Sequence, residues 1–217
     1  MKKSLKKNRE LIAGTLFLAI ILVLCISGCS SGNKKTAAFQ ITFSSLSINE
    51  SAVTEYGAYL VKNIPELVID GKAPVLSSIL MGEVKNDPEA GVFSDPMLGM
   101  AGIMRMAAVV STGEMDVFIA DMDNAARNAR GGMFLSLEEI YTSDELKNLE
   151  SRLLSFDILK TDTAEPEPTG EKTPLCGINI TGNEQMRKIF GNQEIGVFIV
   201  ANTKNLELAK KVMNSLI

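Results

Sequence analysis

The stretch "DVFIADMDNAARNARGG" (Asp116–Gly132) decides the fold class, because it passes directly from a strand pattern into a helix pattern. Residues 116–121 form an apolar run between two aspartates, which is typical of a buried strand. Residues 122–130 begin with acidic and amide side chains and end at a glycine pair, which predicts a short helix. A buried strand followed at once by a helix indicates a layered α/β domain.

Alternating elements extend on both sides of this unit. Pro65 and Pro96 mark the end of one predicted helix and the start of another. Strands are predicted at 38–45, 74–84, 175–181 and 194–202, and helices at 47–64, 96–113, 143–156 (running into a strand), 183–190 and 204–217. The sequence therefore predicts an α/β domain over 38–217, with a mainly parallel sheet and flanking helices.

The predicted helix at 96–113 is apolar on nearly every side, and Arg105 is its only charge. A helix of this kind is expected to lie buried between layers. Its methionines allow a second interpretation, a ligand- or metal-binding patch, but filling of the core is the more common use of this side chain. We therefore assign these four methionines to the core: Met97, Met100, Met104 and Met106.

The N-terminal segment has the pattern of an export signal. A basic stretch at 1–10 precedes an apolar run at 11–24, which is shorter than the roughly 20 residues of a membrane-spanning helix. The following "ISGC" (26–29) resembles the lipobox of bacterial lipoproteins. That resemblance implies that 1–28 is a cleaved signal peptide and that Cys29 carries the lipid, with 29–37 as a flexible tether. An uncleaved signal anchor is the alternative.

Composition restricts the class of function. The signal segment holds five of the 22 basic and one of the 26 acidic residues, so the rest has 17 against 25 and a net charge of −8. This charge argues against a nucleic-acid partner. The chain has no histidine, and Cys176 is the one cysteine of the predicted domain, which we expect to be buried. We therefore predict no enzyme activity, no metal and no cofactor.

Asp121 and Asp123, which follow the central strand, allow three interpretations. They resemble the Asp-x-Asp motif of haloacid-dehalogenase phosphotransferases, but no aspartate follows Lys188 to complete that metal site. A calcium loop fails because Ala126 and Gly132 replace the glycine and glutamate that an EF-hand requires. The third interpretation is that the two aspartates cap the following helix.

The same aspartates also suit a binding site. Ligands of open α/β sheets bind beyond the carboxyl ends of the strands. We therefore predict a small polar solute, such as a sugar or an amine, in contact with residues that follow the first and central strands: Ser44, Ser45, Asp121, Asp123 and Asn124. Phosphates are not expected, because the sequence offers no glycine-rich loop with lysine there.

The order of segments resembles the extracellular solute-binding lipoproteins of bacterial ABC importers. The likeness rests on the lipobox, the first strand, the return strand with the final helix, and a central pattern of Gly113, Asp116, Asp121, Gly132 and Leu137. The resemblance implies a type II periplasmic-binding-protein fold, a location on the outer face of the cell membrane, and an ABC-transporter permease as a partner.

The chain is short for this family. The second lobe is therefore expected to be reduced to 145–195, including a disordered acidic loop at 161–174. The alternative function is an interaction module of the same fold that docks on another envelope protein and takes no small ligand. An exposed apolar patch or a stable dimer would favour that alternative.

Overall fold

The computed structural model describes residues 38–81, 96–113, 115–160 and 167–217. The predicted signal peptide, the lipid attachment residue Cys29 and the tether lie outside the described residues, so these remain predictions. Residues 37–217 form one compact unit.

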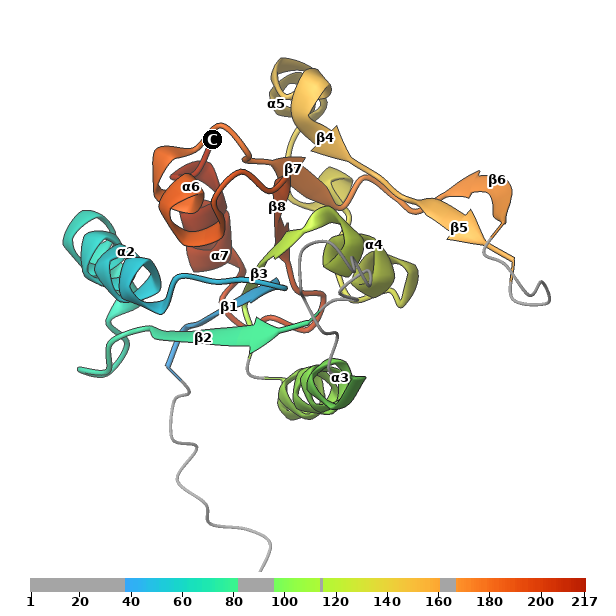
Figure 1. Cartoon of the computed structure of the whole chain (residues 1–217). Coiled ribbons are helices and arrows are strands. Elements are labelled where there is room, and N and C mark those ends of the chain that lie inside the picture. The colour runs from blue at the N-terminus through green and yellow to red at the C-terminus, as the bar shows by residue number, and fades with distance from the viewer. Residues whose placement is uncertain (1–37, 82–95, 114, 161–166) are drawn as a thin grey trace, which may run out of the picture. The chain divides into compact units, whose positions relative to one another are not determined.

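The centre of this unit is a six-stranded sheet in the order β2-β1-β3-β8-β7-β4 (Figure 1). Its strands are β1 (Gln40–Ser45), β2 (Val75–Leu80), β3 (Val117–Asp121), β4 (Leu153–Leu154), β7 (Gly177–Asn179) and β8 (Ile195–Ile199). Strand β1 pairs in parallel with both β2 and β3, and the other pairings are antiparallel. Four of the six strands, β1, β2, β3 and β7, point in one direction, and β8 and β4 point in the other. The predicted α/β class with a mainly parallel sheet is therefore confirmed.

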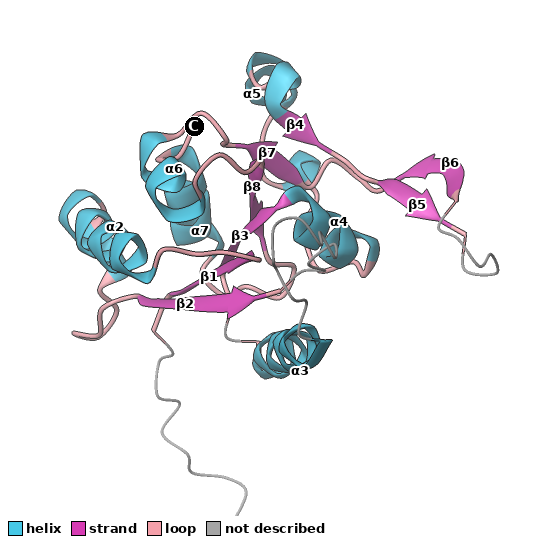
Figure 2. Ribbon diagram, viewed as in Figure 1, coloured by secondary structure: helices cyan, strands magenta, loops and turns pink. Residues whose placement is uncertain are grey.

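Helices cover both faces of the sheet (Figure 2). One face carries α2 (Glu50–Asn63), α6 (Glu184–Phe190) and α7 (Leu206–Asn214), which contribute to the larger apolar core. The other face carries α3 (Pro96–Thr112) and α4 (Met122–Arg130) over a smaller core. The short α5 (Ser143–Asn148) precedes β4.

Helix α2 forms as its sequence predicts. The side chain of Asn49 accepts a hydrogen bond from the Ala52 amide and caps the first turn. Val53, Tyr56 and Leu60 recur at helical spacing and are at most 4% exposed, so the apolar side of the helix seals the larger core.

The predicted burial of α3 is wrong. Met100, Ile103 and Met104 are 63%, 50% and 68% exposed. The helix touches the sheet along one side at the edge strand β2, where Gly102 lies against the Leu80 carbonyl, and no further layer covers its outer side among the described residues. Of the methionines assigned to the core, Met106 is buried at 5% exposure, Met100 and Met104 are exposed, and the Met97 side chain lies outside the described residues.

Residues 143–156 contain a helix that is followed by a strand, as predicted, and the helix is short. It ends at Asn148 and is followed by a 3-10 turn at Glu150–Arg152 and by β4. Thr142 forms a capping box with Glu145: the Thr142 Oγ1 accepts from the Glu145 amide, and the Glu145 carboxylate accepts from the Thr142 amide.

Residues 145–195, the predicted second lobe, supply β4 and β7 to the main sheet. They also supply a separate two-stranded ribbon of β5 (Asp157–Leu159) and β6 (Pro168–Lys172). Strand β6 is exposed along its whole length and takes the place of part of the loop predicted at 161–174, because its backbone pairs with β5; 161–166 lie outside the described residues. In the described parts of the chain, no helix is long and apolar enough to cross a bilayer.

Candidate functional site

The carboxyl ends of β1 and β2 and the start of α4 converge on one residue, Met81. Its amide donates to the Ser45 carbonyl over 3.0 Å, and its carbonyl accepts from Asn124 Nδ2 over 2.8 Å. The ends of β1 and β3, which were predicted to carry the ligand contacts, are therefore brought together, as parallel strands require.

Asp121 caps α4. Its Oδ1 accepts from the Asn124 amide over 2.9 Å and its Oδ2 accepts from Asn124 Nδ2 over 3.0 Å. Asp123 is exposed in the first turn of the same helix, where a negative charge is favourable. The capping interpretation is confirmed for Asp121, whose two carboxylate oxygens both serve the helix start.

The serines at the end of β1 face the interior, and each is 0% exposed. Ser45 Oγ donates to the side chain of Gln193, whose Nε2 donates to the Phe190 carbonyl, so Ser45 is tied to the segment that follows α6. Ser44 Oγ and Asn124 Oδ1 are buried without a hydrogen-bond partner. Of the five predicted ligand contacts, only Asp123 is exposed; Asp121 is half-buried.

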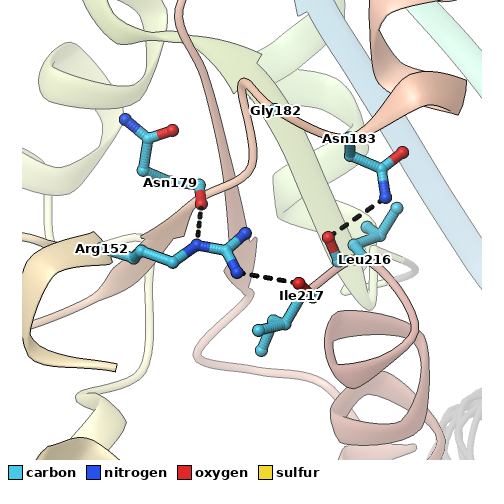
Figure 3. A pocket seen from close by; sticks show the side chains of 6 residues that line it. All are labelled: Arg152, Asn179, Gly182, Asn183, Leu216 and Ile217. Atoms are coloured by element: carbon cyan, nitrogen blue, oxygen red, sulfur yellow. Dashed lines mark hydrogen bonds between the residues drawn. The ribbon is translucent and has the colours of Figure 1, made fainter. Parts of the chain in front are cut away.

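An open cavity lies further along the same edge of the sheet. It has a volume of about 460 Å³, within the range of roughly 300–1,000 Å³ that small-molecule sites occupy. Its lining residues are Arg152, Asn179, Gly182, Asn183, Leu216 and Ile217 (Figure 3). Asn179 ends β7, which is separated by β8 alone from β3 and Asp121. Two strand spacings, roughly 10 Å, therefore separate the cavity from the predicted position.

Arg152 carries the charged side chain among the residues that line this cavity. Its Nε donates to the Asn179 carbonyl over 3.0 Å, and its Nη1 donates to the backbone oxygen of Ile217 over 2.8 Å (Figure 3). Among the described residues, its Nη2 has no hydrogen-bond partner. An arginine fork held in this way presents a fixed donor, which suits a carboxylate or another acceptor-rich group.

Polar loop residues complete the cavity wall. Asn183 caps α6 through Oδ1, which accepts from the Gln185 and Met186 amides, and its Nδ2 donates to the Leu216 carbonyl over 3.1 Å. A side chain added at Gly182 would meet no atom within 4 Å. The stretch "NITGN" (179–183) after β7 was a signal for this site, because strand-end reasoning applies to every strand that points the same way.

Cys176 and Asp116 are buried and have structural roles. Cys176 is 4% exposed, as predicted, and burial raises the pKa of its thiol to about 11, so it stays protonated near neutral pH. Asp116 is 4% exposed and accepts hydrogen bonds from the Gln40 amide, Thr203 Oγ1 and Asn205 Nδ2, which join β1 and β3 to the start of α7. Over the described ranges, no three cysteine, aspartate or glutamate side chains gather as metal ligands would.

Comparison of the chain with family models, with curated proteins and with solved structures finds no match.

Proposed function

We propose that this chain is a lipid-anchored, non-catalytic binding protein on the outer face of the cell membrane, with a small polar solute as its ligand. The observation that carries the proposal is the 460 Å³ cavity at the carboxyl edge of the sheet, lined by a fixed guanidinium and by amide side chains. In open α/β sheets this edge is the usual place for a ligand.

The lining selects the chemical class of the solute. Arg152 offers a free N–H beside its bond to the Ile217 backbone oxygen, and the described lining residues include no carboxylate side chain. A solute that accepts hydrogen bonds, such as a small carboxylic acid or a sugar acid, fits this lining better than the amine considered from the sequence. The predicted contacts Ser44, Asp121 and Asn124 lie on the same edge of the sheet. Asp121 is engaged in the cap of α4, and Ser44 and Asn124 are buried, so we rank this position below the cavity as a binding site.

The anchor and the partner follow from the sequence pattern. Acyl chains on Cys29 would hold the domain at the bilayer, and an ABC-transporter permease is the partner that the resemblance implies, with a type II periplasmic-binding-protein fold in reduced form. Replacement of Cys29 by alanine should abolish the incorporation of labelled fatty acid into the chain. Retention of the fatty-acid label in this variant would refute the anchor.

The test of solute binding is a thermal-unfolding screen against sugars, sugar acids, amino acids and small dicarboxylates. A form beginning at Ser30 is suitable, because residues 37–217 contain both apolar cores and form one compact unit. A solute at about 100 times its dissociation constant stabilises the fold by about 2.7 kcal/mol, which raises the unfolding temperature by several degrees.

Matched variants locate the site. Arg152→Lys keeps the charge but loses the fork between two carbonyls, so it should reduce the ligand-induced shift. Arg130→Lys is the control, because Arg130 also donates Nε to a backbone carbonyl, that of Asp157, away from the cavity. Loss of the shift in Asp121→Ala alone would place the solute at the end of β3 instead, and no shift across the panel would count against solute binding.

A further inference from the structure

The outer face of α3 is a continuous apolar stripe. Positions that recur at i, i+3, i+4, i+7 and i+8 share one side of a helix. On α3 these positions are all exposed: Met100, Ile103, Met104, Ala107 and Ala108. Single exposed apolar side chains are common on soluble proteins, but a contiguous stripe marks a surface that something covers.

The opposite side of α3 already has its partner. Gly102 and Met106 are buried, and the Gly102 position lies close to the Leu80 carbonyl and the Met81 side chain. The helix is therefore held on the domain by one side, and the exposed stripe is directed away from the sheet. A helix side that faces water is normally polar, so exposure to solvent does not account for this second apolar side.

The length of the tether allows α3 to reach the membrane surface that would carry the predicted lipid. Eight residues separate Cys29 from Ala38, which allows a reach of at most about 30 Å. The C-terminal end of α3 lies near the start of β1, because the Asp116 amide donates to the Gln40 carbonyl over 3.0 Å and Gly113 is three residues before Asp116. That end is therefore within about 15 Å of the point where the tether joins the sheet.

Charge distinguishes this segment from the rest of the domain. Residues 96–113 contain no acidic side chain and one cation, Arg105, whereas the chain after the signal segment carries a net charge of −8. An anionic lipid surface repels the acidic domain as a whole. It does not repel this segment, which carries one cation and no acidic side chain. The predicted tether contains two further cations, Lys34 and Lys35. A second copy is a poorer occupant, because one helix stripe is small beside the roughly 1,000 Å² that a stable protein interface buries.

We propose that the exposed stripe of α3 lies on the outer leaflet of the membrane that carries the Cys29 anchor, and so fixes the orientation of the domain on the bilayer. The inference rests on the lipid anchor of the proposed function and is independent of the solute. It assigns α3 the role of a second, weak membrane contact that supplements the acyl chains.

The chain contains no tryptophan, which allows a site-specific test. The full lipidated chain carrying Met104→Trp is reconstituted into vesicles of phosphatidylcholine and phosphatidylglycerol, with and without bromine high on the acyl chains. The indole emission should shift to shorter wavelength and be quenched by bromine, because an interfacial helix buries its apolar side about 5–10 Å. Tyr59→Trp is the control: Tyr59 is 40% exposed on α2, on the other face of the sheet, and should show neither effect.

Further arms separate the possible results. Ile103→Glu in the Met104→Trp background should reverse the shift, because it places a charge in the stripe. Recovery of the chain with the vesicles but without a shift overturns the inference and leaves the anchor standing, whereas a chain that stays in the supernatant overturns both. A shift without bromine quenching, or one that grows with protein density on the vesicle, assigns the stripe to a protein partner and overturns the inference. Equal quenching of both probes overturns the proposed orientation.

Discussion

Helices α2 and α3 are the two longest helices of the described chain, and they lie on opposite faces of the sheet. The inner side of α2 is buried and apolar, and its outer side presents polar residues such as Thr54, Glu55 and Lys62. The inner side of α3 is buried too, but its outer side is again apolar. The difference lies in the outer sides alone. The outer side of α2 is polar and suits contact with water, whereas the outer side of α3 is apolar and does not.

The two helices also use glycine differently. Gly102 in α3 allows the helix to approach the β2 backbone closely, whereas Gly57 in α2 faces the flexible Leu76 side chain. Helix α3 is thus held by close backbone approach at an edge strand, and α2 by large side chains over the sheet. Substitutions on each helix therefore test which contacts hold it in place.

The largest effect is expected on the inner side of α2. Leu60 is fully buried in the larger core, so Leu60→Ala should lower the free energy of unfolding by about 2–5 kcal/mol. Chemical denaturation of the form beginning at Ser30 measures the change. A loss below about 1 kcal/mol would contradict the arrangement of this core, since cavities in well-filled cores cost more than that.

The next effect separates the glycines. A Cβ at Gly102 would lie 2.5 Å from the Leu80 carbonyl oxygen, so Gly102→Ala should force α3 away from β2 and cost about 1–3 kcal/mol. Gly57→Ala is the matched control. Its Cβ would meet Leu76 Cδ2 at 3.3 Å, at the end of a flexible side chain, so alanine should stay within about 1 kcal/mol of the parent because its better helix propensity offsets the contact.

The comparison of Gly102→Ala with Gly57→Ala tests how closely α3 approaches β2. If both alanines stabilise the chain alike in denaturation, α3 does not approach β2 as closely as the structure shows.

The same contrast explains what could be predicted from sequence. Local rules placed α2, because its cap and its one-sided apolar stripe lie within a single segment, and they placed the Asp121 cap for the same reason. They failed for the burial of α3, because hydropathy shows that a surface avoids water and does not show what covers it. An all-apolar helix at a sheet edge has the same sequence pattern as one between layers.

The candidate site was also predictable only in part. The edge of the sheet was predictable from strand direction, and the cavity does lie at that edge. Arg152 was not, because the sequence placed it within a helix that runs into a strand at 143–156, and its role depends on the backbone oxygens of Asn179 and Ile217, of which Ile217 is distant in sequence. Nor was the burial of Ser44 and Ser45, which depends on the neighbouring strands and on Gln193.

A smaller effect is expected at the cap of α4, which shares the face of α3. Asp121→Ala removes both acceptors from Asn124 and should cost about 1 kcal/mol of unfolding free energy. Asp123→Ala is the control on the same turn: Asp123 is exposed and is not the cap residue, so the change should be within about 0.5 kcal/mol. Equal losses for the two variants in a denaturant titration would show that charge near the helix start, and not the cap, stabilises α4.

The smallest effect on stability is expected on the stripe itself. Ile103 is 50% exposed and Met104 is 68% exposed, so Ile103→Ser and Met104→Ser should each change the free energy of unfolding of the soluble form by no more than about 0.5 kcal/mol. This near-zero result is informative, because the same substitutions at the inner position Met106, which is 5% exposed, should cost about 2 kcal/mol or more. Denaturant titrations of the three variants side by side give the comparison. A substantial loss at Ile103 or Met104 in the soluble form would mean that the domain itself covers the stripe, and α3 would then be a buried helix like those of the opposite face.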